Sequence, residues 1–294
     1  MTPLRLGLAA LVLVCLAAGA VLGLVAVADA PGLRIGAKNF TESRILAELM
    51  AREVERATGR PATVVELGST SLCVDALARG AIDAYPEYTG TLLADVFRRP
   101  PVADPDLGLA EVRAAAVVDG RFRVLDPFGF DNTYALAMRR DRAAALGIRR
   151  IGDLAAHPTL VFGFTGEFVQ RPDGWPGLRR HYGLPAGTVP VELAPGHLYA
   201  AVRDGQVDVV SAFSTDARIA RFDLVLLADD RRFFPAYLAV PLIRADAPPG
   251  LAGAWGRLAG RLDGPGMMAL NAQADQDAAP VGTVAKRFLA TLPP

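Results

Sequence analysis

Beyond residue 32, short apolar runs alternate with amphipathic segments. Ile45, Leu46, Leu49 and Val54 recur at a helical spacing, and Gly59 follows as a stop signal. The elements expected in the first part of the chain are strands over 33–36, 62–67 and 81–84 and helices over 41–58 and 69–79. A β-α-β-α order of this kind is typical of an α/β sheet with parallel strands.

The same alternation restarts further along the chain. We expect strands over 122–128, 133–139, 159–164, 189–193, 207–212, 224–227 and 237–243, and helices over 175–182, 198–203, 215–221, 251–262, 266–274 and 281–292. No stretch rich in proline and glycine separates the two α/β units, and no internal repeat is visible. The pattern therefore predicts two lobes that are joined by strands.

The first 30 residues have a different character. Arg5 is the only charged side chain before Asp29, and residues 6–28 are almost wholly Leu, Val, Ala and Gly. This pattern predicts a signal peptide over residues 1–28 that is cleaved after Ala28, which ends an A-x-A motif. A retained membrane anchor is the alternative, because the apolar run is long enough to cross a bilayer. Cys15 lies inside this run and is a poor match to a lipoprotein signal.

Charge and cysteine content narrow the function classes. The chain has 31 basic and 31 acidic residues, a balance that gives no reason to expect a nucleic-acid partner. After removal of the signal, Cys73 is the one remaining cysteine, and it is expected to be a small buried hydrophobe. With three histidines besides, no zinc or other metal site is expected, and no cofactor.

Polar and aromatic clusters follow several of the expected strands. They are the segments 38–41, 85–91 and 213–216. In open α/β sheets, ligands bind outside the carboxyl ends of the strands. These three segments are therefore expected to converge on a ligand site.

Several of these segments are also sequence motifs of a known family. The motifs are Gly36-Ala37-Lys38-Asn39-Phe40-Thr41-Glu42, 83–91, Asn132-Thr133-Tyr134-Ala135-Leu136, Glu167-Phe168 with Arg171-x-Asp173-Gly174, 213–219, and Asp229-Asp230 with 233–237. In this order, over residues 33 to 292, the chain resembles the substrate-binding proteins of glycine betaine/carnitine/choline ABC transporters. The resemblance implies an α/β, two-lobe type II periplasmic-binding-protein fold with the ligand cleft between the lobes. It places the first lobe at 33–133 and 238–294 and the second at 134–237.

The resemblance also implies which residues hold the ligand. Four aromatic side chains form a box around a quaternary ammonium group in the family, and they fall on Tyr88, Tyr134, Phe213 and Tyr237. Rings suit this group because it carries a positive charge but no N–H to donate. Phe213 departs from the family, which usually has Tyr at this position.

The carboxylate of a betaine is held in the family by residues that correspond to Lys38, Thr91 and Arg171. Asn132 occupies a position where some members have Asp facing the methyl groups. Neutral Asn weakens the electrostatic support for a cation, and the adjacent Asp131 is a candidate to compensate.

Structural roles compete with these assignments. Arg171 could pair with Glu167 or Asp173, and Thr91 could cap the helix that follows it. Phe213 could belong to the core, and Lys38 could be a solvated surface charge. Tyr85 and Trp175 are expected to be packing residues, and Glu87 a structural hydrogen-bond acceptor.

The expected function is therefore the capture, without catalysis, of glycine betaine, choline or a similar solute. The protein is expected to be an exported monomer that works with an ABC permease and its ATPase. An alternative keeps the fold and binds another zwitterion, such as carnitine or ergothioneine. A hydrolase that uses Ser214 and His197 is disfavoured, because no Gly-x-Ser-x-Gly elbow is present. A sensory module of a transcription factor is disfavoured by the expected export signal and the lack of a DNA-binding helix pair.

Overall fold

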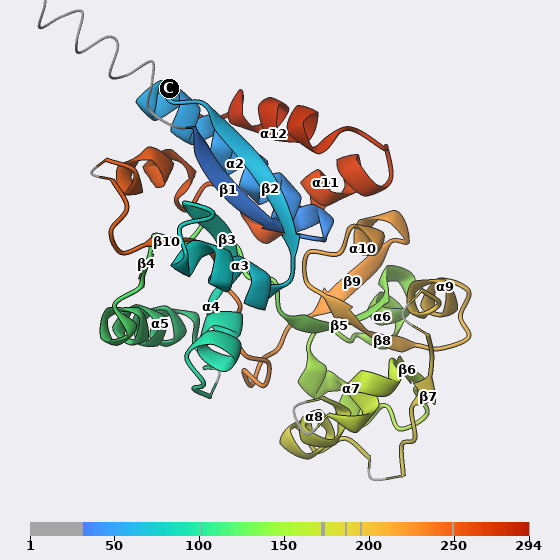
Figure 1. Ribbon diagram of the computed structural model, residues 1–294. Coiled ribbons are helices and arrows are strands. Elements are labelled where there is room, and N and C mark those ends of the chain that lie inside the picture. The colour runs from blue at the N-terminus through green and yellow to red at the C-terminus, as the bar shows by residue number, and fades with distance from the viewer. Residues whose placement is uncertain are drawn as a thin grey trace, which may run out of the picture.

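Two five-stranded sheets organise the chain in the computed structural model, which describes residues 32–100, 102–171, 174–185, 187–194, 196–248 and 250–293 (Figure 1). The expected signal peptide and Cys15 lie outside these residues. Within the described ranges, we find no helix with both the length and the apolar character needed to span a bilayer.

The first lobe is the part of the molecule built on the first sheet. This sheet has the order β2 (Ala62–Gly68), β1 (Leu33–Lys38), β3 (Ala84–Tyr88), β10 (Ala239–Arg244) and β4 (Phe122–Val124). Its helices are α2 (Thr41–Thr58), α3 (Thr70–Ala78), α4 (Thr89–Thr91), the π-helical turn η1 (Leu92–Val96), α5 (Pro105–Asp119), the 3-10 helix η3 (Ala252–Leu258), α11 (Gly264–Asp275) and α12 (Val281–Leu289). β1 is parallel to β2 and β3, whereas β10 is antiparallel to β3 and β4.

The second lobe repeats this arrangement on the second sheet. The sheet has the order β7 (Val191–Glu192), β6 (Phe162–Phe164), β8 (Val209–Phe213), β5 (Tyr134–Arg139) and β9 (Leu224–Leu227). Its helices are α6 (Arg140–Leu146), the 3-10 helix η2 (Ile151–Ala156), α7 (Gly166–Gln170), α8 (Trp175–Tyr182), α9 (Leu198–Arg203) and α10 (Ala217–Arg221). In both sheets the fourth strand in the order, β10 or β5, runs antiparallel to its neighbours. Along the chain, each of these two strands is the first after a crossing from the other sheet.

Apolar faces on both sides of each sheet form the cores of the two lobes. The apolar face of α2, which includes Ile45, Leu46 and Leu49, packs on the first sheet and is fully buried there. Each such side chain contributes about 1.5–3 kcal/mol by its burial. Gly59 ends the helix at a positive φ of 67°, which glycine adopts without steric cost. Cys73 is fully buried in the first lobe, as predicted.

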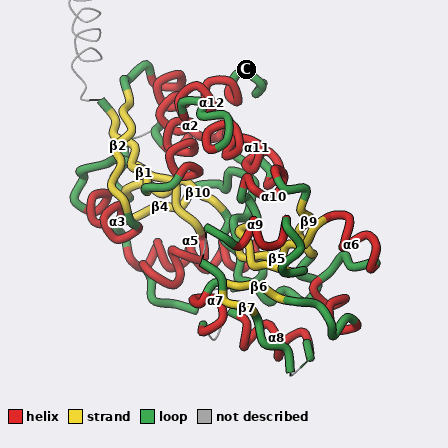
Figure 2. The backbone as a smooth tube through the Cα atoms, turned by 90° about the vertical axis from the view of Figure 1, so that its right-hand side faces the viewer, coloured by secondary structure: helices red, strands yellow, loops and turns green. Residues whose placement is uncertain are grey.

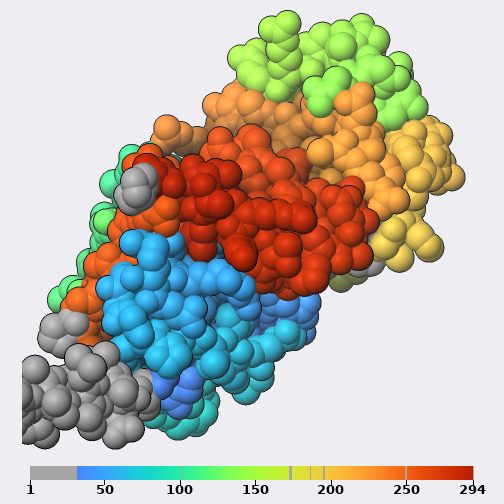
Figure 3. All heavy atoms as spheres, turned by 90° about the horizontal axis from the view of Figure 1, so that it is seen from above, coloured from blue at the N-terminus to red at the C-terminus, as the bar shows by residue number. Residues whose placement is uncertain are grey.

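In the view from above, the red atoms of the C-terminal segment lie across the middle of the molecule (Figure 3). α12 and α11 pack against α2, and α11 also contacts α10 of the second lobe. Figure 2 shows the strands of the first sheet at the upper left and those of the second at the lower right, with α11 and α10 next to each other above β9. The lobes therefore meet at this helix pair as well as at the strands that connect them.

Some predicted elements differ in the structure. The strand predicted over 81–84 begins only at its last residue and runs over Ala84–Tyr88. Residues 81–83 form a bend in which the Asp83 carboxylate accepts the backbone N–H of Arg34 at 2.8 Å. The strand expected over 122–128 ends at Val124, before Pro127, and the 189–193 strand shrinks to two residues. The segment expected to be an α-helix over 251–262 is a shorter 3-10 helix that contains two glycines.

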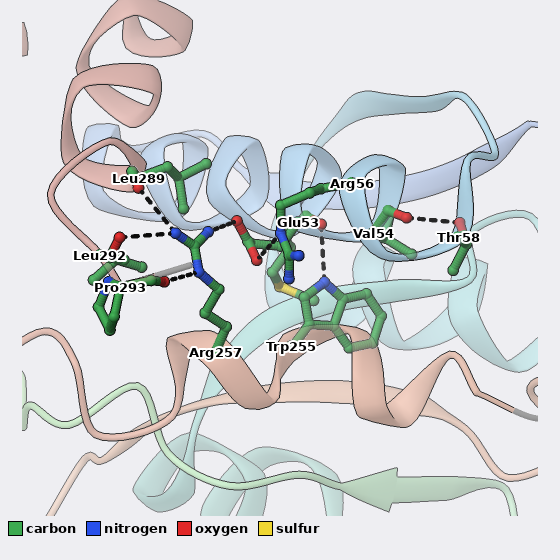
Figure 4. A network of polar contacts seen from close by, with 10 residues as sticks. Glu53, Val54, Arg56, Thr58, Trp255, Arg257, Leu289, Leu292 and Pro293 are labelled. Carbon is green, nitrogen blue, oxygen red and sulfur yellow. Dashed lines mark hydrogen bonds and ion pairs between the residues drawn. The ribbon is translucent and has the colours of Figure 1, made fainter.

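A network of polar contacts ties the C-terminus to α2 (Figure 4). Arg257 donates to the carboxylate of Glu53 at 2.7 Å and to the backbone carbonyls of Leu289, Leu292 and Pro293. Glu53 is only 1% exposed and also pairs with Arg56, whose side chain is half exposed. The charge of Glu53 therefore depends on two arginines, of which Arg257 is the more buried.

We expect Arg257→Ala to lower the free energy of unfolding by about 2–3 kcal/mol, because a buried carboxylate loses one of its two cationic partners. Urea unfolding followed by circular dichroism measures this change. The matched control is Arg287→Ala, which removes an exposed arginine of α12 and should change the stability by less than about 0.5 kcal/mol. Equal losses from the two variants would show that the Glu53 network contributes nothing specific.

Two antiparallel segments carry the chain between the lobes. Asp131 and Leu238 form a β-bridge, and Asn132 donates its backbone N–H to the carbonyl of Tyr237 at 3.2 Å. The Asp131 carboxylate accepts the backbone N–H of Tyr237 at 2.8 Å. Burial raises the pKa of this carboxyl to about 6, and the bond from Tyr237 opposes the shift.

This pKa makes the stability depend on pH. In the unfolded chain Asp131 ionises near its ordinary value of 3.8, so between about pH 4 and pH 6 the folded protein holds a proton that the unfolded chain has lost. The contribution of Asp131 to stability therefore falls as the pH rises through this window, and the cost persists above it.

We expect Asp131→Asn to be more stable than the wild type above pH 7 by up to about 3 kcal/mol, since a shift of about two pKa units corresponds to this energy. The amide oxygen can still accept from Tyr237. The gain should shrink as the pH falls and should nearly disappear at about pH 3, where Asp131 is mostly protonated in both states. Thermal unfolding from about pH 3 to about pH 8 tests this, and parallel curves for the two proteins would contradict it.

Candidate functional site

A cavity of about 750 Å³ lies between the lobes at the carboxyl ends of β1, β3 and β8. All eight side chains that the sequence placed at the ligand line it, and they come from both lobes. They are Lys38, Tyr88, Thr91, Asn132, Tyr134, Arg171, Phe213 and Tyr237. The two halves of the chain therefore converge on one hollow. Across the described ranges, no three His, Cys, Asp or Glu side chains gather closely enough to hold a metal ion.

Tyr88 and Lys38 form the wall of the cavity on the first lobe. The ring of Tyr88 is 5% exposed, and the ring of Phe40 stacks near it with centroids 6.3 Å apart. The Lys38 ammonium lies 4.8 Å from the Tyr88 centroid and forms a buried ion pair with Glu87. The alternative that Lys38 is a solvated surface charge is therefore wrong, because the side chain is buried. Its charge is balanced by Glu87.

Glu87 has the structural role that the sequence indicated. Besides the ion pair with Lys38, its carboxylate accepts the backbone N–H of Tyr88 at 3.0 Å, and the side chain is fully buried. Tyr85 and Trp175 are buried packing residues, as predicted.

Tyr134 and Phe213 form the aromatic wall of the second lobe. Their rings stack with centroids 4.8 Å apart and an interplanar angle of 30°. Phe168 and Phe234 contact Tyr134 from behind, at 5.3 and 6.3 Å between centroids, and hold its ring in place. Phe213 is 49% exposed, so it faces the cavity and does not belong to the core.

Tyr237 enters the cavity from the segment that returns to the first lobe. Its ring packs directly on Gly90: a Cβ at this glycine would come within 2.7 Å of the ring. A larger residue at position 90 would therefore push the ring away. Gly90 belongs to the motif that the sequence singled out, and the contact explains the requirement for glycine there.

Thr91 and Arg171 lie on opposite lobes of the cavity. No side-chain hydrogen bond from Thr91 caps the helical turn that follows, so the capping alternative is wrong. Arg171 donates to Glu167 at 3.2 Å, as its structural alternative predicted, and both side chains are largely exposed. Arg171 also lines the cavity, so a ligand there can contact it.

Glu42 is a cavity residue to which the sequence analysis gave no role. It lies in the first turn of α2 and is 4% exposed. One carboxylate oxygen accepts the Tyr88 hydroxyl at 2.6 Å and the Asn132 amide at 2.9 Å, and the other accepts the Asn271 amide at 3.1 Å. Its position within the first motif, on the buried face of an amphipathic helix, was the signal that could have identified it.

The proposed compensation by Asp131 does not fit the geometry. Asp131 accepts the Tyr237 backbone and is not among the side chains that line the cavity. Asn132 contacts Glu42 instead.

Burial, and next the charge of Glu42, raise the pKa of Tyr88 well above its usual range, so the phenol stays protonated and donates to the carboxylate.

Further polar residues, to which the sequence analysis gave no individual role, line the part of the cavity near α10 and α11. They are Thr41, Thr215, Asp216, Arg218, Arg221, Asn271, Asp275 and Gln276. The Asn271 amide also donates to the carbonyl of Thr215 at 3.1 Å, and Gln276 donates to that of Ala217 at 2.9 Å. These bonds join the lobes beside the site.

The chain resembles transport proteins over most of its length. The OpuAC family model, described as the substrate-binding domain of the ABC-type glycine betaine transport system, matches residues 31–291. The glycine-betaine-binding protein of Pseudomonas aeruginosa is 34% identical over 276 residues, which are 89% of this chain and 88% of the relative. The carnitine transport binding protein OpuCC of Listeria monocytogenes is 31% identical over 267 residues, 87% of this chain and 85% of that protein.

The fold agrees with these relatives. A crystal structure described as a glycine betaine/carnitine/choline ABC transporter superposes with a TM-score of 0.83 and 30% identity, covering 88% of this chain and 97% of that one. The two-lobe α/β architecture expected from the sequence is thereby confirmed. With the family model matching nearly all of the described residues, the chain belongs to the family of substrate-binding domains of ABC-type glycine betaine transport systems.

Proposed function

We propose that this chain captures a quaternary-ammonium solute, glycine betaine or choline, for an ABC importer. The observation that carries the proposal is the convergence of Tyr88, Tyr134, Phe213 and Tyr237, from both lobes, on one cavity. A trimethylammonium group has no N–H to donate, and a ring face attracts it by about 0.5–2 kcal/mol when water is excluded. Because the rings come from both lobes, a ligand that contacts all of them stabilises the form in which the lobes are closed.

The carboxylate of a betaine would lie against Arg171 and Thr91. Arg171 suits this role because it lines the cavity, and a guanidinium can bind a carboxylate with two parallel hydrogen bonds. Lys38 can add a donor, although Glu87 already balances its charge. Choline lacks the carboxylate and would present only its hydroxyl to this end of the site.

We further propose that residues 1–28 are a signal peptide and that the mature protein acts as a periplasmic or otherwise extracytoplasmic monomer. In this proposal, residues 33–133 and 238–294 form the first lobe, residues 134–237 form the second, and the closed protein delivers its ligand to a membrane permease with its ATPase. No catalysis is proposed. The Ser214 hydroxyl is used by the backbone of the crossover, donating to Asp131 and accepting from Thr133.

A second candidate is the same fold binding carnitine or ergothioneine. Phe213, which lacks the hydroxyl of the usual tyrosine, and neutral Asn132 both line the cavity and favour this option. A thermal-shift screen of the mature protein against glycine betaine, choline, carnitine, proline betaine and ergothioneine tests both candidates. We expect the largest stabilisation from betaine or choline, and no shift with any of the five would contradict the proposal.

We expect Gly90→Ala to weaken binding of the preferred ligand by about 1 kcal/mol or more, because the added methyl group displaces the Tyr237 ring. Tyr237→Ala should give a loss of similar size. Isothermal titration calorimetry measures both. The matched control is Gly187→Ala, since a Cβ at that glycine meets nothing within 4 Å. Unchanged affinity in both site variants would remove Tyr237 from the site.

A further inference from the structure

Glu42 stands apart from the other charged groups around the cavity. The residue is only 4% exposed. Its carboxylate nevertheless accepts hydrogen bonds from three neutral side chains, those of Tyr88, Asn132 and Asn271. Among the ion pairs of the described residues, none involves Glu42, whereas nearby Glu87 is paired with Lys38. The wall of the first lobe therefore carries one buried negative charge that no side-chain cation balances.

A structural role explains this charge only in part. A carboxylate in the first turn of a helix is stabilised by the positive end of the helix dipole, typically by about 0.3–1 kcal/mol. The oxygens of Glu42, however, accept from side chains on three other parts of the chain, and the residue lines the cavity. A buried charge without an opposite charge is costly, and a cationic ligand would remove much of that cost.

The partners of Glu42 connect it to the aromatic wall. The Tyr88 hydroxyl donates to the carboxylate at 2.6 Å. This bond draws the hydroxyl proton away from the phenol oxygen, and so enriches the oxygen and the ring in electrons. An electron-rich ring face attracts a cation more strongly. Glu42 can therefore act on a bound cation twice, through its own field and through the ring of Tyr88.

We infer that Glu42 is the counter-anion of the site, and that it sets the preference for ligands with net positive charge over zwitterions. This inference rests on the proposed function. Asn132 occupies the position where the resemblance implies an Asp in some members of the family. Its amide donates to the Glu42 carboxylate at 2.9 Å. The negative charge of the site therefore lies on Glu42, next to this position.

The test compares Glu42→Gln with the wild type on three ligands: choline, glycine betaine and 3,3-dimethylbutan-1-ol, the uncharged isostere of choline. Glutamine can still accept from Tyr88, and the Asn271 amide oxygen, which is buried without a partner, can turn to accept the new N–H. We expect choline affinity to fall about tenfold or more, betaine affinity to fall less, and affinity for the alcohol to stay unchanged. Calorimetry measures the affinities for choline and glycine betaine, and titration by NMR measures the affinity for the alcohol.

Three further variants separate the effect of charge from the effect of structure. Glu66→Gln makes the same change of net charge at a half-exposed residue paired with Arg44, and should leave all three affinities unchanged. Adding Asn132→Asp to Glu42→Gln returns a carboxylate to the site and should restore choline affinity. Arg171→Gln should have the opposite selectivity, weakening betaine more than choline.

The outcomes are distinct. A lower ratio of choline to alcohol affinity in Glu42→Gln, with rescue by Asn132→Asp, supports the inference. Equal losses for choline and the alcohol, or no loss for either, overturn it and leave the proposed function intact. A wild type that binds neither choline nor betaine overturns the proposed function and the inference with it.

Discussion

Two short antiparallel segments, 131–133 and 235–238, connect the lobes, and the geometry of the cavity depends on their pairing. The bridge between Asp131 and Leu238 and the bond from the Tyr237 backbone to the Asp131 carboxylate hold them side by side. Asn132 and Tyr237 belong to these segments, and Tyr134 follows directly. Any change in the angle between the lobes therefore moves these side chains relative to Tyr88, which the first sheet holds.

The charges around the cavity follow from what is buried. Lys38 and Glu87 are both inaccessible and neutralise each other, so neither dominates the field in the cavity. Glu42 is equally buried but has neutral partners, and Arg171 is exposed on the opposite lobe. The wall of the first lobe near Tyr88 is therefore negative, and Arg171 supplies a guanidinium on the second lobe. A zwitterion can align with this asymmetry, with its ammonium group toward Glu42 and its carboxylate toward Arg171.

The sequence predicted the strands and helices wherever periodicity was strong, as for the helix over 41–58, which matches α2 residue for residue. It missed α5, whose exposed Leu107, Val117 and Val118 blur the apolar stripe, although Asp104 caps its start and Gly120 its end. The resemblance identified eight side chains that the structure brings to one cavity. It could not identify Glu42 as a charge of the site, because burial and neutral partners are properties of the folded chain.

The same limit explains the Asp131 prediction. Adjacency to Asn132 in the sequence suggested a shared role, but successive residues of an extended segment point to opposite sides. Asn132 faces the cavity, and Asp131 turns to the returning segment.

The most direct test of the account is the affinity of the mature protein for glycine, sarcosine, dimethylglycine and glycine betaine, measured by calorimetry at one pH. These ligands share a carboxylate and a net charge and differ in the number of N-methyl groups. If ring faces hold the ammonium group, affinity rises with each methyl group and is highest for betaine. Equal affinities, or a preference for glycine, would show that hydrogen-bond acceptors hold the ammonium group, and would contradict the account.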